Sequence, residues 1–394
     1  MINEYVLSPF TYIYVEKNKY IIGDIFNKKS EVKLESIEEI LPNKDLISKG
    51  IFIKKSKINY IKETYFKKLE EKFYSNNIKI GYMETTSICP YKCKMCPKSS
   101  NDLERVTNEM HFDLFKKIVK QLNQKYITLH LFGDPFFDSD IYSKIGYLND
   151  NNIMPSFSTN LTSLNKIDFD RLRRTNIDYL TISIDTTNSE EFSKIRGKVN
   201  NKFFENSFLS LEKLINISNE SNCINHIILQ MIDLNINSEQ SELIEKIASK
   251  YDNCSFFKKQ FILFPNMKDV ELKSDNIIEG NNKVLIYQLL GVDLPFKCLK
   301  PWKQNELGVL SDGAIVPCCL SFNSTVKIGN LNNQTLNDIK NGESFKKFRY
   351  GIWNKGYVGE ICTNCTQSKT KISNQLIPSD KLDFLIDYCI SSWN

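Results

Sequence analysis

Histidine is scarce in this sequence, and long apolar runs are missing altogether. The 394 residues include three histidines, His111, His130 and His226, and no two of them have the spacing of metal ligands. A histidine-based metal site is therefore not expected. No apolar stretch approaches the roughly 20 residues that a membrane-spanning helix needs. Residues 1–20 alternate apolar residues with Glu, Lys and Asn and lack a signal-peptide core, which predicts a cytoplasmic protein without membrane contact.

An excess of charge of one sign is missing as well. The chain has 52 Lys and Arg against 47 Asp and Glu, and its net charge of +5 is spread along the chain without a basic patch. The composition therefore gives no reason to expect nucleic-acid binding. Because 41% of the residues are hydrophobic, a chain of this length can bury a sizeable core, and we expect one large domain with smaller additions.

Cysteine, in contrast, is plentiful. There are 11 cysteines and no export signal, which argues against a disulfide framework and for metal ligation in a reducing compartment. Cys89, Cys93 and Cys96 form a C-x3-C-x2-C loop directly after a short apolar stretch. Three thiolates in one loop can hold a cluster of four irons and leave one iron without a protein ligand. Structural zinc is the alternative, but it favours matched C-x2-C pairs, which this spacing does not provide.

Strands and helices alternate strictly between residue 78 and about residue 265. Apolar strands are expected at 80–84, 126–132, 153–158, 179–184, 227–232 and 255–263, with amphipathic helices between them. This alternation predicts an α/β fold whose parallel sheet has helices on its outside. Six such units fall short of the eight that close a TIM barrel, so we expect a partial (β/α)6 TIM-like barrel.

The cysteine loop and Gly133-Asp134-Pro135, which follows the second expected strand, together resemble motifs of the radical SAM superfamily. The resemblance implies a 4Fe-4S cluster on the three cysteines and binding of S-adenosylmethionine (SAM) to its open iron. It also implies that Met95, where an aromatic residue is more usual, contacts the adenine, and that Gly133 and Asp134 contact the amino group of SAM. Asp134 replaces the commoner Glu and reaches one methylene less far. Read as an ordinary turn, Gly-Asp-Pro needs no cofactor.

Polar residues at further strand ends extend this expected SAM site, because function collects at the carboxyl ends of the strands in a parallel barrel. Asn160 ends the third strand, and Ser183 and Asp185 end the fourth. By the same resemblance, Arg196 in a short basic turn pairs with the SAM carboxylate, a planar contact that suits a guanidinium group. Gln230 is a weaker candidate. The ordinary alternative for all five residues is a polar side chain that faces water.

A cysteine-rich module is expected at residues 296–367, as a β-hairpin followed by a helix over 336–348. It resembles the Twitch, or shortened SPASM, extension of radical SAM enzymes such as 2-deoxy-scyllo-inosamine dehydrogenase. The resemblance implies an auxiliary 4Fe-4S cluster with four ligands, Cys298, Cys318, Cys362 and Cys365. A structural zinc site has a similar ligand set and remains the alternative. Cys319 is expected on the opposite side of an extended segment from Cys318 and is treated as a spare.

The rest of the chain divides into smaller parts. Residues 1–60 read as a small α+β unit with three strands and a helix that begins after the Ser36 and Glu39 capping box. This unit loosely resembles the winged recognition element that some peptide-modifying enzymes carry, and a structural cap is the other reading. Residues 61–77 are expected to form a linker helix, 266–295 a linker and 368–394 a C-terminal tail. Cys223, Cys254 and Cys389 are expected to be buried small apolar side chains.

The function implied by these resemblances is reductive cleavage of SAM followed by abstraction of a substrate hydrogen atom, with the auxiliary cluster supporting a net oxidation. The electron is expected from a reductant such as flavodoxin or ferredoxin. Two substrate classes stay open: a ribosomally made peptide, favoured by residues 1–53, and a sugar, aminocyclitol or similar small polar metabolite, favoured by the Twitch resemblance. An unpaired, uncharged strand edge in the N-terminal unit would favour the peptide. The sequence assigns no catalytic base.

Overall fold

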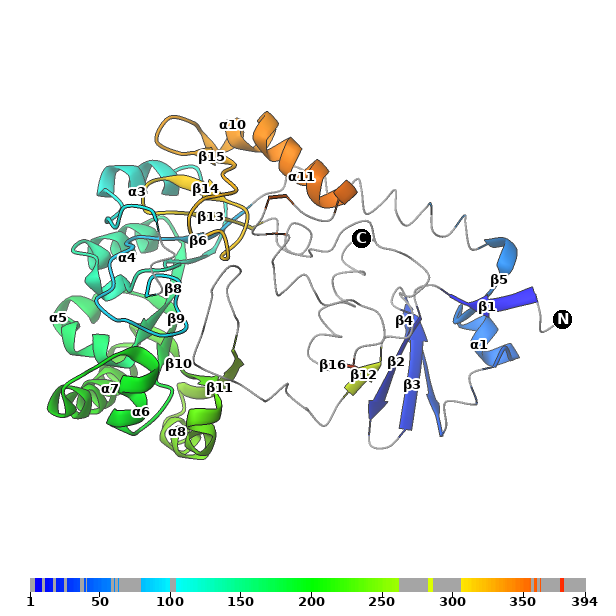
Figure 1. The fold of residues 1–394 in the computed structure, drawn as a ribbon, viewed down its shortest axis with the longest axis horizontal. Coiled ribbons are helices and arrows are strands. Elements are labelled where there is room, and N and C mark those ends of the chain that lie inside the picture. Colours follow the sequence, from blue (N-terminus) through cyan, green and yellow to red (C-terminus); the bar gives the residue numbers. More distant parts are fainter. Residues whose placement is uncertain are drawn as a thin grey trace.

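The computed structural model describes residues 4–8, 11–16, 19–24, 27–35, 39, 41–57, 60, 63, 79–99, 104–261, 283–285, 306–355, 358–359, 362 and 376–378. The described strands form sheets of two, five and nine strands. The nine-stranded sheet and its helices hold the main core, and the five-stranded sheet belongs to the N-terminal unit, which Figure 1 draws in blue.

Six neighbouring strands of the large sheet run parallel in the order β11-β10-β9-β8-β7-β6. They are β6 (Lys79–Met83), β7 (Tyr126–Thr128), β8 (Met154–Asn160), β9 (Ile177–Ser183), β10 (Ile224–Asp233) and β11 (Cys254–Gln260). Each strand expected between residues 78 and 265 is present. The predicted α/β fold with a partial, six-stranded barrel is therefore confirmed.

Helices cover the outer face of this sheet (Figure 1). They are α3 (Phe112–Val119), α4 (Ile141–Asp150), α5 (Phe169–Leu172), α6 (Ser189–Arg196), α7 (Asn201–Ser221) and α8 (Ser241–Ala248), with short 3-10 turns η4 (Pro135–Phe137), η5 (Leu161–Lys166) and η6 (Asn235–Gln240). Side-chain caps start several of them, as where Asn188 accepts from the N–H groups of Glu190 and Glu191. Apolar side chains on the helices, such as Phe115 and Phe192, belong to the same core as Phe157 of β8, and all three are 0% exposed.

The C-terminal module continues the barrel sheet, which the sequence did not predict. Strand β13 (Glu306–Val309) pairs parallel with β6, and β14 (Ala314–Val316) and β15 (Gly329–Asn330) then add antiparallel (Figure 1). The expected β-hairpin is present, with its turn at Asp312-Gly313, and Gly313 has the positive φ of 79° that this turn requires. The single expected helix is two, α10 (Leu336–Asn341) and α11 (Glu343–Lys355), because Gly342 leaves the helical conformation with ψ 153°.

The N-terminal unit contains a meander of β2 (Thr11–Glu16), β3 (Lys19–Asp24) and β4 (Asn27–Leu34). Two strands from distant segments extend it in the order β16-β12-β2-β3-β4: β12 (Lys283–Leu285) and β16 (Leu376–Pro378). Residues expected to be linker and tail therefore contribute strands here. A separate pair, β1 (Tyr5–Leu7) and β5 (Phe52–Lys54), is followed by the 3-10 turn η3 (Lys55–Lys57).

In the described part of this unit, one helix begins after Asn43. Helix α1 (Lys44–Ser48) is capped by Asn43, whose Oδ1 accepts from the N–H of Leu46 at 2.9 Å. The start expected at the Ser36 and Glu39 capping box falls largely on residues that the structure does not describe. Ser36 itself lies outside the described residues, as does most of the expected linker helix 61–77. In the described part of the chain, no helix is both long and apolar enough to cross a membrane.

Candidate functional site

The cysteine loop leaves the carboxyl end of β6, where the barrel places its functional residues. The ammonium group of Lys98 donates to the carbonyl oxygens of Ser87 and Cys89 at 2.9 and 3.0 Å and ties the two ends of the loop together. The N–H of Cys96 donates to the carbonyl of Cys93 at 3.0 Å. The loop is thus a folded turn that carries three thiols, with Cys93 buried and the other two half-buried.

Burial raises the pKa of all three thiols. It raises the pKa of Cys89 to about 12, with a further contribution from the Asp134 carboxylate, and that of Cys96 to about 11, with a contribution from Cys93. The pKa of Cys93 is raised by the same burial, and the nearby Arg196 opposes the shift. Thiolates in this loop therefore need a compensating positive charge, which metal ions supply when thiols ligate them.

Gly133 fits its position because a side chain there would overlap the strand end that leads into the cysteine loop. A Cβ on Gly133 would lie 2.0 Å from the carbonyl oxygen of Thr86 and 2.9 Å from Cα of Ser87. The next residue, Asp134, donates its N–H to the carbonyl of Ile88 at 3.0 Å. The Gly-Asp-Pro segment is therefore fixed directly against the cysteine loop, as the resemblance requires.

The carboxylate of Asp134 is buried and used inside the protein. It accepts from the N–H groups of Phe136 and Asn160 and from the hydroxyls of Thr159 and Ser163, at distances between 2.6 and 3.1 Å. Burial raises the pKa of this carboxyl and these donors oppose the shift. Asp134 therefore joins the second strand end to the third, and the sequence analysis missed the roles of Thr159 and Ser163.

Asp185 and Arg196 form a buried ion pair, with 2.5 Å between Oδ2 and Nε. Asp185 has a positive φ of 52° and also accepts the N–H of Ile232 at 2.8 Å. The guanidinium donates through Nη1 to the Sγ of Cys93 at 3.8 Å. Nη2 of Arg196 is buried without a hydrogen-bond partner among the described residues. One donor of Arg196 therefore remains for a ligand beside the cysteine loop.

The other predicted SAM contacts lie around the same end of the barrel. Asn160 uses Oδ1 to cap η5, while its buried Nδ2 has no partner among the described residues. Ser183 is paired in register with both Asn160 and Gln230 on neighbouring strands. Met95 is buried in an apolar cluster with Cys93 and Ile195. The structure thus brings all of these side chains to the end of the barrel that carries the cysteine loop.

These observations fit an iron–sulfur cluster and an anionic ligand. The donor set is three cysteines in one loop, the cradle at Gly133 excludes a Cβ, and two buried donors, Arg196 Nη2 and Asn160 Nδ2, are unsatisfied. Unsatisfied buried donors are costly and indicate a missing partner. No three His, Cys, Asp or Glu side chains of the described residues converge into a ready-made metal site, so the fit rests on the donor chemistry of the loop.

Part of the predicted auxiliary site can be described. Cys318, Cys319 and Cys362 have half-buried side chains, whereas Cys298 and Cys365 lie outside the described residues, as does Cys389. The segment after β14 is a turn, because the N–H of Ser321 donates to the carbonyl of Cys318 at 3.2 Å. The expected extended alternation of Cys318 and Cys319 is therefore wrong. Cys223 and Cys254 are buried, as expected.

A buried network between the barrel and the C-terminal module was not predicted. Glu84 follows β6 and pairs with Arg105, with 2.5 Å between Oε1 and Nη2. Oε2 of Glu84 accepts from both the N–H and the hydroxyl of Ser311 in the β13–β14 hairpin, at 3.1 and 3.0 Å. Arg105 also donates to the carbonyl of Phe322 at 2.7 Å. The sequence Glu84-Thr85-Thr86 contains no motif from which the role of Glu84 in this network could be predicted.

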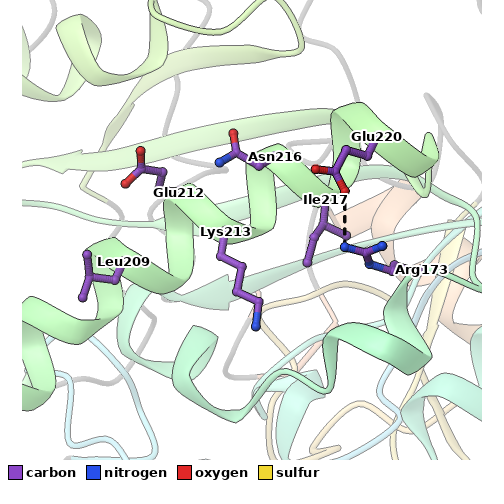
Figure 2. A pocket seen from close by; sticks show the side chains of 7 residues that line it. All are labelled: Arg173, Leu209, Glu212, Lys213, Asn216, Ile217 and Glu220. Carbon is purple, nitrogen blue, oxygen red and sulfur yellow. Dashed lines mark hydrogen bonds and ion pairs between the residues drawn. The ribbon is translucent and has the colours of Figure 1, made fainter.

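A shallow surface depression runs along the outward face of α7 (Figure 2). Figure 2 shows the exposed pair of Arg173 and Glu220, whose Nη2 and Oε2 are 3.2 Å apart. The lining of the depression includes Leu209, which is 65% exposed, and none of the predicted site residues. The depression is therefore part of the ordinary solvent-facing surface.

Two family models match the chain. Residues 83–252 match the Radical SAM superfamily, and residues 298–366 match SPASM, an iron–sulfur cluster-binding domain. The fold and the cysteine loop therefore define a radical SAM enzyme, which uses a 4Fe-4S cluster and SAM. More particularly, the chain belongs to the radical SAM enzymes with a C-terminal SPASM-type domain, which supplies auxiliary iron–sulfur binding.

Individual relatives are distant. The PqqA peptide cyclase of Granulibacter bethesdensis is 20% identical over 302 residues, which cover 72% of this chain and 78% of that protein. The solved structure of native anSMEcpe with bound AdoMet is 14% identical and has a TM-score of 0.50, covering 79% of this chain and 94% of that one. BtrN in complex with AdoMet and 2-DOIA is 16% identical with a TM-score of 0.39, covering 73% and 93%.

Proposed function

We propose that this protein modifies a ribosomally synthesised peptide by reductive cleavage of SAM and abstraction of a hydrogen atom from the peptide. The observation that carries the chemistry is the cysteine loop packed against Gly133, with the unpaired donor of Arg196 beside Cys93. The similarity to a PqqA peptide cyclase over most of both chains supports a peptide as the substrate.

Different residues of the chain have separate roles in this reaction. Cys89, Cys93 and Cys96 hold the cluster, Gly133 lets the ligand-binding segment approach it, and Arg196 and Asn160 offer donors to the carboxylate and hydroxyl groups of SAM. The bound cluster and SAM supply the hydrogen-abstracting chemistry. Asp185 orients Arg196 through the buried ion pair and through its own bond to the N–H of Ile232.

The proposed reaction is a net two-electron oxidation of the peptide. A one-electron reductant of the flavodoxin or ferredoxin class would supply the electron for cleavage of SAM, and the peptide would give up one hydrogen atom to form 5'-deoxyadenosine. Cys298, Cys318, Cys362 and Cys365 would hold the auxiliary cluster, which would accept the second electron of the peptide, while a base would take the proton.

The N-terminal sheet gives mixed support for peptide capture. Its β2 edge is covered by β12, whereas β4 ends the sheet in the part of the chain that the structure describes. The β4 sequence carries Lys28, Lys29 and Lys33 against Glu31. Among the described residues, the β4 edge is therefore unpaired but basic, where an uncharged edge was expected to favour a peptide, and it suits strand addition by an acidic segment.

The test follows deuterium from substrate to product. The reconstituted enzyme is given SAM, dithionite and either a fully deuterated mixture of cellular peptides or the deuterated small-metabolite fraction of the same cells. We expect 5'-deoxyadenosine one mass unit heavier with the peptides alone. A mass shift confined to the metabolite fraction, which contains sugars and aminocyclitols, would instead identify a small-molecule dehydrogenase.

A further inference from the structure

The concave face of the barrel is mainly polar and uncharged from β7 to β10. Leu180, Ile182 and Leu229 belong to the core under the helices, so the residues that alternate with them face the inside of the barrel. By strand register this inner face carries Ile228 and the polar residues Thr128, Ser156, Ser158, Thr181, Ser183 and Gln230. A charged residue on the neighbouring strand β11 therefore stands out on this face.

Two consecutive lysines on β11 point to opposite faces of this sheet. Lys258 is in register with Met231, a core residue, and its Nζ is 3.0 Å from Oδ1 of Asp233. Lys259 is in register with Ile232 and therefore faces the inside of the barrel. Lys258 is therefore paired with a carboxylate on the outer face, whereas Lys259 has no such partner among the described residues.

The position of Ile232 places Lys259 near the SAM site. Ile232, the register partner of Lys259, packs against the apolar cluster that contains Cys93 and Met95. The pKa values agree with an inward orientation, because Lys259 helps to lower the pKa of His130, which follows β7, although three strands separate β7 from β11 in the sheet. Arg196 and Cys319 in turn affect the pKa of Lys259. Lys259 therefore faces the inside of the barrel near its cysteine-loop end.

Lys259 lacks a counter-ion in the part of the chain that the structure describes. Its pKa is lowered chiefly by burial, with Arg196 adding to the shift and Cys319 opposing it. Nearby carboxylates are used elsewhere: Asp185 by Arg196, Asp233 by Lys258 and Glu84 by Arg105. His130 is neutral near pH 7, because burial and Lys259 lower its pKa to about 4. A partly buried cation without a partner favours an anionic ligand and disfavours a cationic one.

We propose that Lys259 binds the carboxylate of an Asp or Glu side chain of the peptide substrate inside the barrel. The inference rests on the proposed function and names the chemistry of the residue that the enzyme accepts. Lys259 thereby holds the acidic residue near the SAM site, where an adjacent carbon is open to oxidation.

The test uses three random peptide libraries that differ in one central residue, fixed as Glu, Gln or Lys. Full-length reconstituted enzyme with SAM and without reductant is used to capture peptides, and the captured fractions are compared for wild type, Lys259→Gln, Lys259→Glu and the matched control Lys258→Gln. We expect wild type and the Lys258 variant to prefer the Glu library by about tenfold or more, the scale of a hydrogen bond to a charged group.

The Lys259→Gln variant is expected to lose this preference, and Lys259→Glu to turn it toward the Lys library, which a purely structural role would not produce. Capture of the Glu and Gln libraries to the same extent by wild type, or an equal loss in the Lys258 variant, would overturn the inference. Cleavage of SAM by dithionite-reduced wild type is measured separately. If that cleavage is absent, the proposed function fails, and the capture ratios still report on Lys259.

Discussion

At the scale of single residues, backbone packing holds the cysteine loop in place. Gly133 touches the backbone of Thr86 and Ser87, where even one additional carbon has no room. The contact partner is backbone and cannot swing away as a flexible side chain would. The position of the loop against the barrel therefore depends on the absence of a Cβ at Gly133.

Gly133→Ala is expected to displace the cysteine loop and to abolish cleavage of SAM, because the new Cβ would lie 2.0 Å from the Thr86 oxygen. Production of 5'-deoxyadenosine under dithionite measures this. The control is Gly146→Ala in α4, where a Cβ meets nothing within 4 Å. That variant should keep full activity and gain about 0.5–1 kcal/mol of stability from helix propensity. Equal activity of the two variants would contradict the role of Gly133.

His130 makes the stability of the barrel depend on pH. Its Nδ1 accepts the N–H of Ser158 at 3.1 Å, and its pKa is lowered from 6.5 to about 4, chiefly by burial. The unfolded chain therefore binds a proton first as the pH falls below 6.5, and the free energy of unfolding decreases between pH 6.5 and 4.

The difference in unfolding free energy between pH 6.5 and 4.5 should be smaller by about 2 kcal/mol in His130→Gln than in wild type. Denaturant unfolding at the two pH values measures it. His111→Gln is the control, because the His111 side chain is 81% exposed. An unchanged pH dependence in His130→Gln would contradict the burial of a neutral imidazole.

The sequence identified the positions of the site better than the partners of its side chains. The cysteine loop could be found from its spacing after a strand, and Gly133 and Arg196 could be found from their resemblance to radical SAM motifs. Three of the four donors to Asp134 come from the end of β8 and from η5, namely the hydroxyls of Thr159 and Ser163 and the N–H of Asn160, and the counter-ion of Arg196 follows β9. Sequence distance hides such contacts, since Asp134 and Ser163 are 29 residues apart.

At the scale of elements, a buried network around one ion pair connects the first barrel strand to the SPASM-type domain. The side chains of Glu84 and Arg105 are 0% and 9% exposed, and Ser311 of the β13–β14 hairpin completes the network. Because β13 pairs with both β6 and β14, the cysteine loop after β6 and Cys318 after β14 are attached to one continuous sheet. Their spacing is therefore set by rigid elements.

Arg105→Ala is expected to cost about 3–5 kcal/mol of stability, because it leaves Glu84 buried without its cation. It should also alter the electron paramagnetic resonance spectrum of the auxiliary cluster. Arg173→Ala removes the exposed pair with Glu220 on α7 and should cost less than about 1 kcal/mol. Similar unfolding free energies for the two variants, with unchanged spectra, would contradict a coupling role for Arg105.

The six parallel strands could be predicted because each is a local apolar segment followed by an amphipathic helix. The attachment of β13 to β6 could not, since their residues are more than 200 positions apart and Glu306–Val309 carries only a short apolar pattern. The helix expected over 336–348 divides at Gly342, where a Cβ would approach the carbonyl of Asp338 to 2.9 Å.

At the scale of the whole molecule, the chain returns to its first sheet twice. Residues 283–285 and 376–378 add to the N-terminal meander from segments on either side of the SPASM-type domain. This arrangement joins the N-terminal unit to the C-terminal half of the chain. No local sequence pattern predicts such pairing, because both strands have three residues.

The central claim is that one cysteine loop activates SAM while a separate set of cysteines holds an auxiliary cluster. The most direct measurement is the iron content and 5'-deoxyadenosine production of anaerobically reconstituted wild type and of the variant with Cys89, Cys93 and Cys96 all replaced by Ala. Wild type should hold about eight irons, as two four-iron clusters require, and the variant about four with no cleavage of SAM. Cleavage of SAM by the triple variant, or an iron content of the variant equal to that of wild type, would contradict this claim.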